Sequence, residues 1–458
     1  MDGRLYTPGA GHVPPVLAGR EEALTGWALV LNDVLAVGRP GAEDTMLLGP
    51  RGVGKTVLMT AMSTAAAEYG FEVINMQAAK GQDSIVDLLV HHAADRLQQA
   101  EGPWRRAKGA FDRLAGVTIG VAPVSASVSV HAPSDRSGRH DPGVLATALA
   151  TLASAVSDGT GRGGVMLTLD EMQVARADDL ALLAAALHRL NVDHSTAPVL
   201  FAGTGLPHTP QVLVGAGVTH PDRLFSREDV PLRLDAEGTA AALIQPAQQR
   251  GVTWHPDAVQ LVVEASNGYP AHLQEMAHRT WQTAAGPAVI TVEDARRGVD
   301  VAARGIARRT LGPRWEATPP RQMEYLAALA VHGGAATVRQ LETTLGRQQK
   351  DLSWIRDRLL EEGDIYAPRR GYVQMTVPLA VPFVLAQYAE SRDLVDDPER
   401  LVDLDTMRDR AGAPRDAPAA PVDALDRVRR TLEHLAGQQV RHSDPRRPPR
   451  RPGGPMPR

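Results

Sequence analysis

The sequence predicts an α/β fold, in which a parallel β-sheet is covered by helices and is followed by a smaller unit of helices and a β-hairpin. Short, continuous apolar runs alternate with helical patterns in the first half of the chain, as in parallel sheets that are buried on both faces. Beyond residue 320 the pattern changes to short helices and an alternating hairpin. The 458 residues are enough for two or three domains.

The expected sheet has five strands, one for each apolar run. We place them at Asp44–Gly49, Phe71–Ala79, Gly164–Asp170, Pro198–Gly205 and Val230–Leu234. A helix is expected in "LAGREEALTGWALVLNDVL", and another from about Gly54 to Glu68. Between the second and third strands, residues 117–130 alternate apolar and small residues on either side of Pro123. This predicts a hairpin, which is either a surface insert or an arm that contacts a partner.

From Asp235 to about Arg309 the pattern is wholly helical, and Thr291 with Asp294 resembles a capping box. A proline-bearing linker, "LGPRWEATPP", follows. Helices are then expected in "RQMEYLAALAVHG", "TVRQLETTLG" and "RQQKDLSWIRDRLLEEG", and a hairpin in "DIYAPRRGYVQMTV". Three short helices and a hairpin are typical of a winged helix-turn-helix. Beyond about Glu390 we expect one helix, in "PVDALDRVRRTLEHLAGQQ", and a disordered tail rich in Arg and Pro.

Composition excludes several classes of protein. Lys+Arg 49 against Asp+Glu 53 gives a net charge of -4, which argues against a protein that coats nucleic acid over its whole surface. The absence of cysteine excludes disulfides, thiolate zinc sites and a thiol nucleophile. No apolar stretch reaches the ~18 residues of a membrane span, so we expect a cytoplasmic protein with no membrane contact. Only four of the basic residues are lysines, so a lysine within a motif is informative.

One stretch matches the complete P-loop pattern, and it lies between a predicted strand and a predicted helix. Its residues are Gly49, Pro50, Arg51, Gly52, Val53, Gly54, Lys55 and Thr56. Glycines let the backbone N–H groups point at phosphate oxygens, and the start of the helix favours negative charge. The Lys55 ammonium would reach the β and γ phosphates, and the Thr56 hydroxyl would bind Mg²⁺. The sequence therefore predicts a P-loop NTPase sheet that binds ATP and Mg²⁺.

Two acidic residues supply the expected second half of the site. Asp170 ends an apolar strand, and Glu171 follows it. Asp170 would hold the magnesium shell, and Glu171 would act as general base on the attacking water, which indicates hydrolysis; the alternative is an ordinary acidic turn. Thr204, in "FAGTG", would lie beside the γ phosphate if its strand lies between the other two. It is then a sensor that orients the water, or otherwise part of a common turn.

The order of "LAGREE", the P-loop, "LDEMQ", "FAGTG", "RLF", "SNGYPAHLQ" and the winged helix resembles AAA-type ATPases of the initiator-like and STAND-like groups. It is most similar to actinobacterial ATP-binding proteins built this way, and the resemblance covers residues 17–386. We place a flexible N-terminus at 1–14, the ATPase core at 15–234 with an insert at 101–163, and a helical lid at 235–312. A winged helix at 316–390 and a linker, short helix and tail at 391–458 complete the chain.

The resemblance also implies roles for residues outside the P-loop. Gly19 and Arg20 would form the turn that borders the adenine. Arg223 lies where relatives place an arginine finger, which completes the site of a neighbouring subunit and implies an ATP-dependent homo-oligomer. Arg227 and Arg233 compete with Arg223 for that role.

The lid departs from the pattern of AAA motors, which carry an arginine soon after a glycine in this region. This chain has Gly268, Tyr269 and Pro270 instead. The sequence is similar to the STAND pattern, in which the lid proline rests against the nucleotide and couples it to domain closure. The residues alone explain Pro270 equally well as the start of a helix after Asn267 and Gly268 end the previous one. The missing arginine favours a switch over a motor.

The winged helix carries basic residues at the two places that such a module presents to DNA. The basic residues are Arg347 and Lys350 at the start of its third helix, together with the polar Gln348, and Arg369 and Arg370 at the tip of the wing. The unit as a whole is nearly neutral, so DNA binding, protein docking and an internal clamp on the ATPase stay open. We expect a slowly hydrolysing ATP-dependent switch. The alternatives are an oligomeric initiator-like DNA-loading ATPase and a signalling or defence scaffold.

Overall fold

A computed structural model describes residues 5–9, 11–37, 44–79, 84–99, 102–119, 141–160, 163–194, 196–284, 288–392 and 401–412. The described residues divide into two compact units. The sheet unit comprises those of Arg4–Pro246 together with Tyr269–Ala271, and the C-terminal unit comprises those of Ala247–Gly268 and His272–Arg458. Each unit is described below by itself.

The sheet unit contains a five-stranded parallel sheet with the order β2-β3-β4-β1-β5. The strands are β1 (Asp44–Leu48), β2 (Glu72–Gln77), β3 (Val165–Asp170), β4 (Val199–Gly205) and β5 (Phe225–Asp229). The first four confirm the predictions. The fifth prediction, Val230–Leu234, is wrong. Because β5 is an edge strand whose last three residues are exposed, it carries charged side chains and shows no apolar run.

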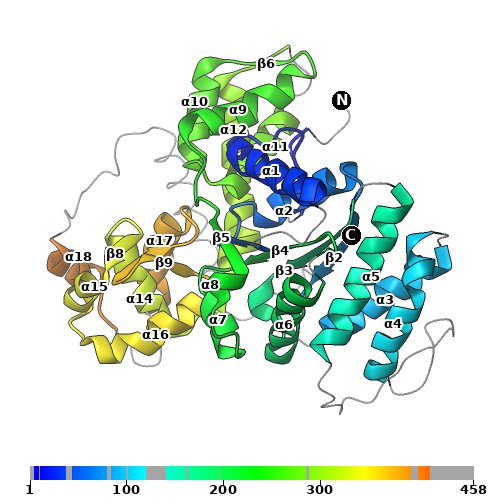
Figure 1. The fold of residues 1–458 in the computed structure, drawn as a ribbon. Helices are drawn as coiled ribbons and strands as arrows, with labels where there is room; N and C mark the ends of the chain where they lie inside the picture. Colours follow the sequence, from blue (N-terminus) through cyan, green and yellow to red (C-terminus); the bar gives the residue numbers. More distant parts are fainter. Residues whose placement is uncertain are drawn as a thin grey trace, which may run out of the picture. The chain divides into compact units, whose positions relative to one another are not determined.

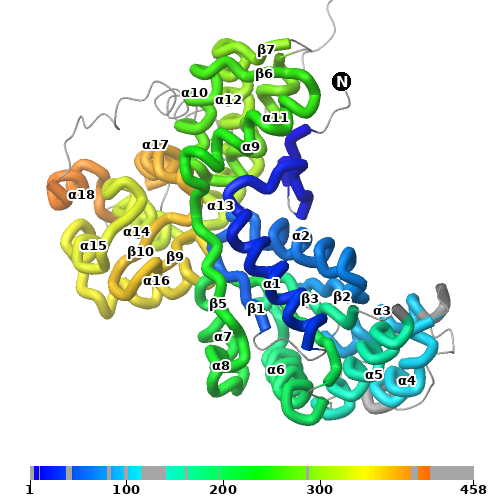
Figure 2. The backbone as a smooth tube through the Cα atoms, turned by 45° about the horizontal axis from the view of Figure 1, so that its top comes forward, coloured from blue at the N-terminus to red at the C-terminus, as the bar shows by residue number. Residues whose placement is uncertain are grey.

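Helices cover both faces of this sheet (Figures 1 and 2). They are α1 (Glu21–Val37), α2 (Lys55–Glu68), α3 (Ile85–Gln99), α4 (Pro103–Ile119), α5 (Pro142–Thr160) and α6 (Ala177–Asp193). Alternate strand residues face opposite layers: Leu47 packs with Trp27 of α1 and Leu58 of α2. Met46 and Leu48 belong to the second layer, which α3, α4, α5 and α6 complete. Because successive side chains of a strand point to opposite faces of the sheet, one apolar run contributes residues to two hydrophobic cores.

Shorter elements complete the sheet unit. They are η1 (Met172–Val174), α7 (Thr209–Gly215), α8 (Pro221–Leu224) and α9 (Ala236–Gln248), which continues into the C-terminal unit. In the segment expected to be a flexible N-terminus, Tyr6 is 1% exposed and its hydroxyl donates a hydrogen bond to the Leu243 carbonyl of α9 at 2.5 Å. Part of the N-terminal segment is therefore packed against the core.

The hairpin expected at residues 117–130 is contradicted at its start. Residues 117–119 are the last residues of α4, and the others lie outside the described residues. The helix buries Trp104, Phe111 and Leu114, a helical spacing that leads up to the point where alternation begins in the sequence. Alternation over a few residues could not show this, because the packing of the preceding turns decides the conformation.

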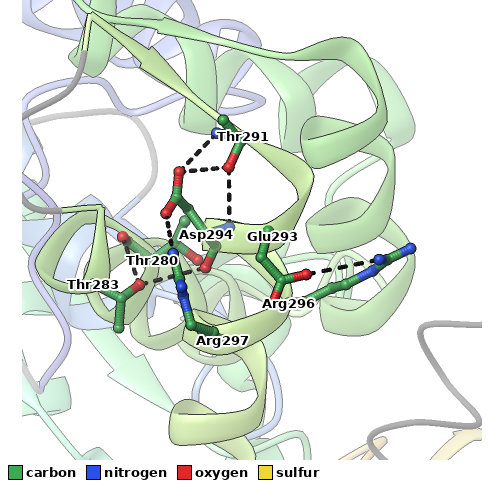
Figure 3. A network of polar contacts seen from close by, with 7 residues as sticks. All are labelled: Thr280, Thr283, Thr291, Glu293, Asp294, Arg296 and Arg297. Atoms are coloured by element: carbon green, nitrogen blue, oxygen red, sulfur yellow. Dashed lines mark hydrogen bonds and ion pairs between the residues drawn. The ribbon is translucent and has the colours of Figure 1, made fainter.

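The C-terminal unit begins with helices α10 (Pro256–Ser266), α11 (Pro270–Thr283), whose first two residues belong to the sheet unit, and α12 (Val292–Ile306). The expectation of a wholly helical region is wrong at two places, because β6 (Thr253–Trp254) pairs in parallel with β7 (Val289–Ile290). The capping box at α12 is confirmed: Thr291 Oγ1 accepts from the Asp294 N–H at 3.2 Å, and Asp294 accepts from the Thr291 N–H at 3.0 Å (Figure 3). Thr283 of α11 donates to the Asp294 carbonyl at 3.3 Å, which ties α11 to the start of α12.

The proline-bearing segment after α12 is not an extended linker. It forms a π-helical turn, η2 (Ala307–Leu311), and helix α13 (Gly312–Glu316). Trp315 is buried, and its indole N–H donates to Ser391 Oγ at 2.9 Å. Arg314 forms an ion pair with Asp364 at 2.5 Å. Pro313 is tolerated because it lies in the first turn of α13, where no backbone donor is required.

The remaining elements include the predicted short helices and hairpin in the predicted order. They are α14 (Pro320–Val331), β8 (Ala335–Thr337), α15 (Val338–Leu345), α16 (Gln349–Glu362), β9 (Ile365–Arg369) and β10 (Tyr372–Met375). The strands form a sheet with the order β8-β10-β9, of which β8 was not predicted. Leu352, Ile355 and Leu359 form the buried stripe of α16, as expected.

Two further helices follow, α17 (Ala380–Arg392) and α18 (Leu404–Ala411). The helix predicted at residues 421–439 and the Arg/Pro-rich tail lie outside the described residues. Among the helices of the described ranges, none combines the length and apolar character that crossing a membrane requires.

Candidate nucleotide-binding site

The predicted site residues from three strands meet at one edge of the sheet. The P-loop follows β1, Asp170 is the last residue of β3, and Thr204 lies near the end of β4. The strand order places β4 between β3 and β1, which is the arrangement that the interpretation of Thr204 required. Parallel strands end at the same edge, so three short sequence motifs converge there.

The carbonyl groups of the P-loop are all held by hydrogen bonds. Lys55 Nζ donates to the carbonyls of Gly49 at 2.9 Å and Pro50 at 2.8 Å. The Tyr269 hydroxyl donates to the Arg51 carbonyl at 2.5 Å, and the Ala271 N–H donates to the Gly52 carbonyl at 3.2 Å. The Val53 carbonyl accepts from the Arg20 guanidinium at 3.0 Å. Each peptide is thereby fixed with its carbonyl engaged, and its N–H group faces the other way.

This arrangement prepares an anion site. Gly52 and Gly54 adopt φ values of 75° and 92°, which let consecutive N–H groups converge. Helix α2 begins at Lys55, so the positive end of its dipole faces the same place. The sequence interpretation of residues 49–56 as a phosphate-binding loop agrees with this geometry.

Lys55 is 6% exposed. Burial lowers the pKa of its ammonium to about 8, and the carboxylates of Glu171 and Asp170 oppose the shift. With this pKa the ammonium is mostly protonated at pH 7, and the two nearby carboxylates favour its charged form. A phosphate would add negative charge to this environment and favour the ammonium further.

Asp170 is the centre of a hydroxyl network. Thr56 Oγ1 donates to Asp170 Oδ2 at 3.0 Å, and Thr204 Oγ1 donates to Asp170 Oδ1. Thr204 has no exposed surface, and Asp170 is 7% exposed. The three side chains therefore form one cluster, buried at Asp170 and Thr204 and partly exposed at Thr56, in which the carboxylate links the P-loop helix to the neighbouring strand.

The residues present fit a magnesium ion. The Thr56 hydroxyl and one Asp170 oxygen are close enough to contact one cation, and hydroxyl and carboxylate oxygens are ligands that Mg²⁺ accepts. Among the described residues, no group of three His, Asp or Glu side chains could hold a metal by itself. Mg²⁺ commonly takes few protein ligands and completes its shell with phosphates and water, so this pair suits a nucleotide-bound ion.

Glu171 has a left-handed backbone, with φ 57°, which costs a non-glycine residue roughly 1 kcal/mol. Its N–H lies 3.0 Å from Asp170 Oδ1 and 3.2 Å from Thr204 Oγ1. Its side chain accepts a hydrogen bond from the Gln173 amide, whose oxygen accepts from the Leu206 N–H at 3.1 Å. Gln173 thus links the predicted base to the residue that follows β4. The sequence interpretation missed this link, because nothing in the "LDEMQ" spacing shows where an amide side chain will point.

Arg20 has a partner that the sequence did not predict. Arg20 is 7% exposed, and its guanidinium donates to the Val53 carbonyl and to the Pro231 carbonyl, the latter at 3.4 Å. Burial lowers the pKa of Arg20, and Glu21 opposes the shift. Arg20 therefore holds the P-loop to the segment after β5. Gly19, at φ 71°, begins this turn, and contact of Gly19 and Arg20 with an adenine stays a prediction.

The three candidate finger arginines differ in their surroundings. Arg223 is exposed, and no ion pair engages it among the described residues. Arg227 is paired with Asp229 at 2.8 Å, and Arg233 also interacts with another group.

Pro270 begins α11, after Asn267 with its left-handed backbone ends α10. This agrees with the interpretation of Pro270 as the start of a helix. The residue before it, Tyr269, makes the contact with the P-loop.

The candidate DNA contacts of the C-terminal unit also differ. Arg347 donates to the buried carboxylate of Glu324 at 3.1 Å. Arg369 lies over the ring of Tyr372, with 5.0 Å between the guanidinium carbon and the ring centroid. Gln348, Lys350 and Arg370 are exposed. The structure therefore gives Arg347 an internal partner and leaves the others at the surface.

Comparison with known proteins agrees with this site. Residues 16–201 match the family described as an AAA ATPase domain, and residues 308–384 match a domain of unknown function (DUF8462). The fold is similar to that of the ORC2 protein of Aeropyrum pernix in its ADPNP–ADP complexes. The TM-score is 0.53 with 13% identity, over 89% of this chain and 98% of that chain.

A Walker-type ATPase of Pyrococcus abyssi is also similar, with a TM-score of 0.50 and 16% identity, over 80% of this chain and 95% of that chain. At these identities the structural similarities establish a shared fold. No curated protein sequence matches the chain significantly.

Proposed function

We propose that this ATPase works as an ATP-dependent molecular switch. Its residues 16–201 match the AAA ATPase domain family. ATP and Mg²⁺ bind at residues 49–56 and Asp170, slow hydrolysis resets the protein, and the C-terminal unit passes the nucleotide state to DNA or to a protein partner. The observation that carries the proposal is the 3.0 Å contact between Thr56 and Asp170 beside Lys55. It joins the two halves of a nucleotide site from distant parts of the sequence.

Each side chain has a separate task in this proposal. The Lys55 ammonium leaves the loop carbonyls and donates to the terminal phosphates. Glu171 accepts the proton of the attacking water, and Thr204, through its hydroxyl, keeps Asp170 and the Glu171 backbone in place. Mg²⁺, when bound, would neutralise charge on the phosphates. The six residues that follow Gly268 include no arginine, which supports a slow cycle.

Arg223 is the finger residue in the proposal, because it is exposed while Arg227 is paired with Asp229. A free guanidinium can enter the site of a neighbouring copy and stabilise charge on the phosphates. This supports an oligomer that forms with ATP. An initiator-like ATPase that loads onto DNA is the second candidate, and the same exposed arginine favours it.

We assign residues 316–390 to a winged helix that reads out the nucleotide state. The order α14, β8, α15, α16, β9 and β10, with a three-stranded sheet, supports this assignment. Lys350, Arg369 and Arg370 are exposed cations at the positions that such a module presents to a duplex. Duplex binding that weakens steeply with salt would support DNA as the partner, and salt-independent binding of a protein would support docking.

The test uses Glu171→Gln, which keeps the shape of the side chain and removes its basicity. We expect ATP affinity within a few-fold of the unaltered protein and a hydrolysis rate lower by about 100-fold or more. Glu22→Gln, an exposed change on α1, is the control and leaves both unchanged. Bound nucleotide and molar mass are measured with and without ATP. The switch is ruled out if Glu171→Gln holds no ATP and its mass never changes. An ATP-dependent mass that is lost in Arg223→Ala supports the finger.

A further inference from the structure

Tyr269 is built into the surroundings of the P-loop. The side chain is 3% exposed and belongs to the core that also contains Leu47, Val53 and Leu58. Its hydroxyl donates to the Arg51 carbonyl at 2.5 Å. The three residues Tyr269–Ala271 group with the sheet unit, although the chain on both sides of them belongs to the C-terminal unit.

The P-loop leaves no room for a side chain at the point where Tyr269 contacts it. A Cβ atom at Gly52 would lie 2.1 Å from the Tyr269 hydroxyl oxygen and 2.7 Å from the ring carbon Cζ. Gly52 also has φ 75°, a conformation that favours glycine. One glycine of the motif is therefore required for contact with Tyr269 as well as for the conformation of the loop.

The backbone before Tyr269 directs it to this position. Asn267 and Gly268 have φ values of 52° and 66°. Two consecutive left-handed residues end α10 and turn the chain sharply before Pro270 begins α11. The Ala271 N–H then donates to the Gly52 carbonyl at 3.2 Å. Two neighbouring peptides of the P-loop are thus held by one short segment.

Peptide geometry gives these two hydrogen bonds a consequence for ligand binding. The Arg51 carbonyl and the Gly52 N–H belong to one planar peptide group, so fixing the carbonyl fixes the direction of the N–H. The Gly52 carbonyl and the Val53 N–H are related in the same way. Tyr269 and Ala271 therefore determine where two N–H groups of the loop point.

We propose that Tyr269 is a positioning residue for nucleotide binding: its hydroxyl orients the Arg51–Gly52 peptide so that the Gly52 N–H is directed at the phosphates. The inference rests on the proposed ATP site and adds a residue outside the P-loop to it. Tyr269 acts through the loop backbone and is not a catalytic residue. Its effect falls on affinity, because the bond is in place before and during the reaction.

The experiment compares Tyr269→Phe with Tyr6→Phe. Both changes remove a buried hydroxyl that donates to a backbone carbonyl at 2.5 Å in the sheet unit, but only Tyr269 contacts the P-loop. We expect Tyr269→Phe to weaken Mg·ATP binding about tenfold and to raise KM with kcat nearly unchanged. Tyr6→Phe leaves both KM and ATP affinity unchanged. Melting temperatures without nucleotide are recorded for both variants.

The outcomes separate this inference from the proposed site itself. If the unaltered protein binds ATP and Tyr269→Phe binds it equally well, Tyr269 has no positioning role. Equal losses of affinity in Tyr269→Phe and Tyr6→Phe would show general destabilisation, and this also overturns the inference. If the unaltered protein does not bind ATP, the proposed function fails first. Tyr269→Leu, which removes the ring as well, is expected to lose more affinity than Tyr269→Phe.

Discussion

The P-loop and the start of helix α16, together with the two residues before it, both carry basic residues that the sequence interpretation selected, but the two regions use their charges differently. Around the P-loop, Lys55 faces the carboxylates of Asp170 and Glu171, and the backbone carbonyls are held by outside groups. Around α16, Arg347 is engaged by the buried Glu324, and Arg358 is paired with Glu361 and Glu362. In the first region a buried cation and two carboxylates lie beside the backbone of the loop. In the second region each of these arginines is paired with a glutamate of the same unit.

The difference shows that a basic residue at the expected position of a motif is not yet a ligand-binding residue. Glu324 is 1% exposed and accepts from Arg321 at 3.1 Å, from Arg347 at 3.1 Å, and from the Val402 N–H at 2.8 Å. It ties α14 to the start of α16 and to the segment before α18. Arg347 is therefore engaged within the fold, whereas Lys350 and Arg370 lie at the surface.

The largest expected effect separates the two regions directly. Lys55→Ala removes the ammonium that would contact the phosphates, so we expect ATP affinity to fall by about 100-fold or more, as for a buried charged partner. Lys350→Ala, on α16, is the matched control and leaves ATP affinity unchanged. Titration with ATP measures both. Unaltered ATP affinity in Lys55→Ala would contradict the assignment of the P-loop.

The next prediction concerns the buried carboxylate of the C-terminal unit. Glu324→Gln keeps the size of the side chain but leaves Arg321 and Arg347 facing a neutral group, so the free energy of unfolding should fall by about 3 kcal/mol. Chemical denaturation measures this change, and ATP affinity should stay constant. Glu361→Gln breaks an exposed ion pair of Arg358 on the same unit and should cost less than about 1 kcal/mol. Equal effects of the two changes would show that Glu324 is not a structural centre.

The smallest prediction uses a buried carboxyl of the sheet unit that has a backbone partner. Asp44 accepts from the Phe201 N–H at 3.1 Å, and burial raises its pKa to about 8. Between pH 4 and pH 8 the folded protein keeps a proton that the unfolded chain has released, so the contribution of Asp44 to stability falls as pH rises across this window. Asp44→Asn cannot ionise and retains an oxygen acceptor.

We therefore compare the free energies of unfolding of Asp44→Asn and the unaltered protein. The value for Asp44→Asn minus that for the unaltered protein should increase by about 1 kcal/mol for each pH unit between pH 5 and pH 7. Denaturation at several pH values measures the difference. A constant difference across this range would mean that Asp44 has an ordinary pKa.

Sequence patterns predicted the sheet where apolar runs are continuous, as in β1, β3 and β4, because buried parallel strands carry such runs. They failed at β5, where the edge strand exposes Arg227 and Glu228. They also failed after α12, where the burial of Trp315 turns a proline-bearing segment into helix. In both places the environment of the segment, rather than its composition, decides the conformation.

The same division holds for the candidate site. By itself the sequence selected the P-loop, Asp170, Glu171 and Thr204 as candidates, because the chemistry of phosphate and magnesium binding uses these residue types at strand ends, where their spacing along the chain is visible. Only the tertiary structure decided that Tyr269 and Arg20 hold the loop carbonyls, that Gln173 contacts Glu171, and that Arg347 is engaged by Glu324. These contacts join residues distant in the chain or depend on the direction of a side chain, and neither property leaves a periodic signal in the sequence.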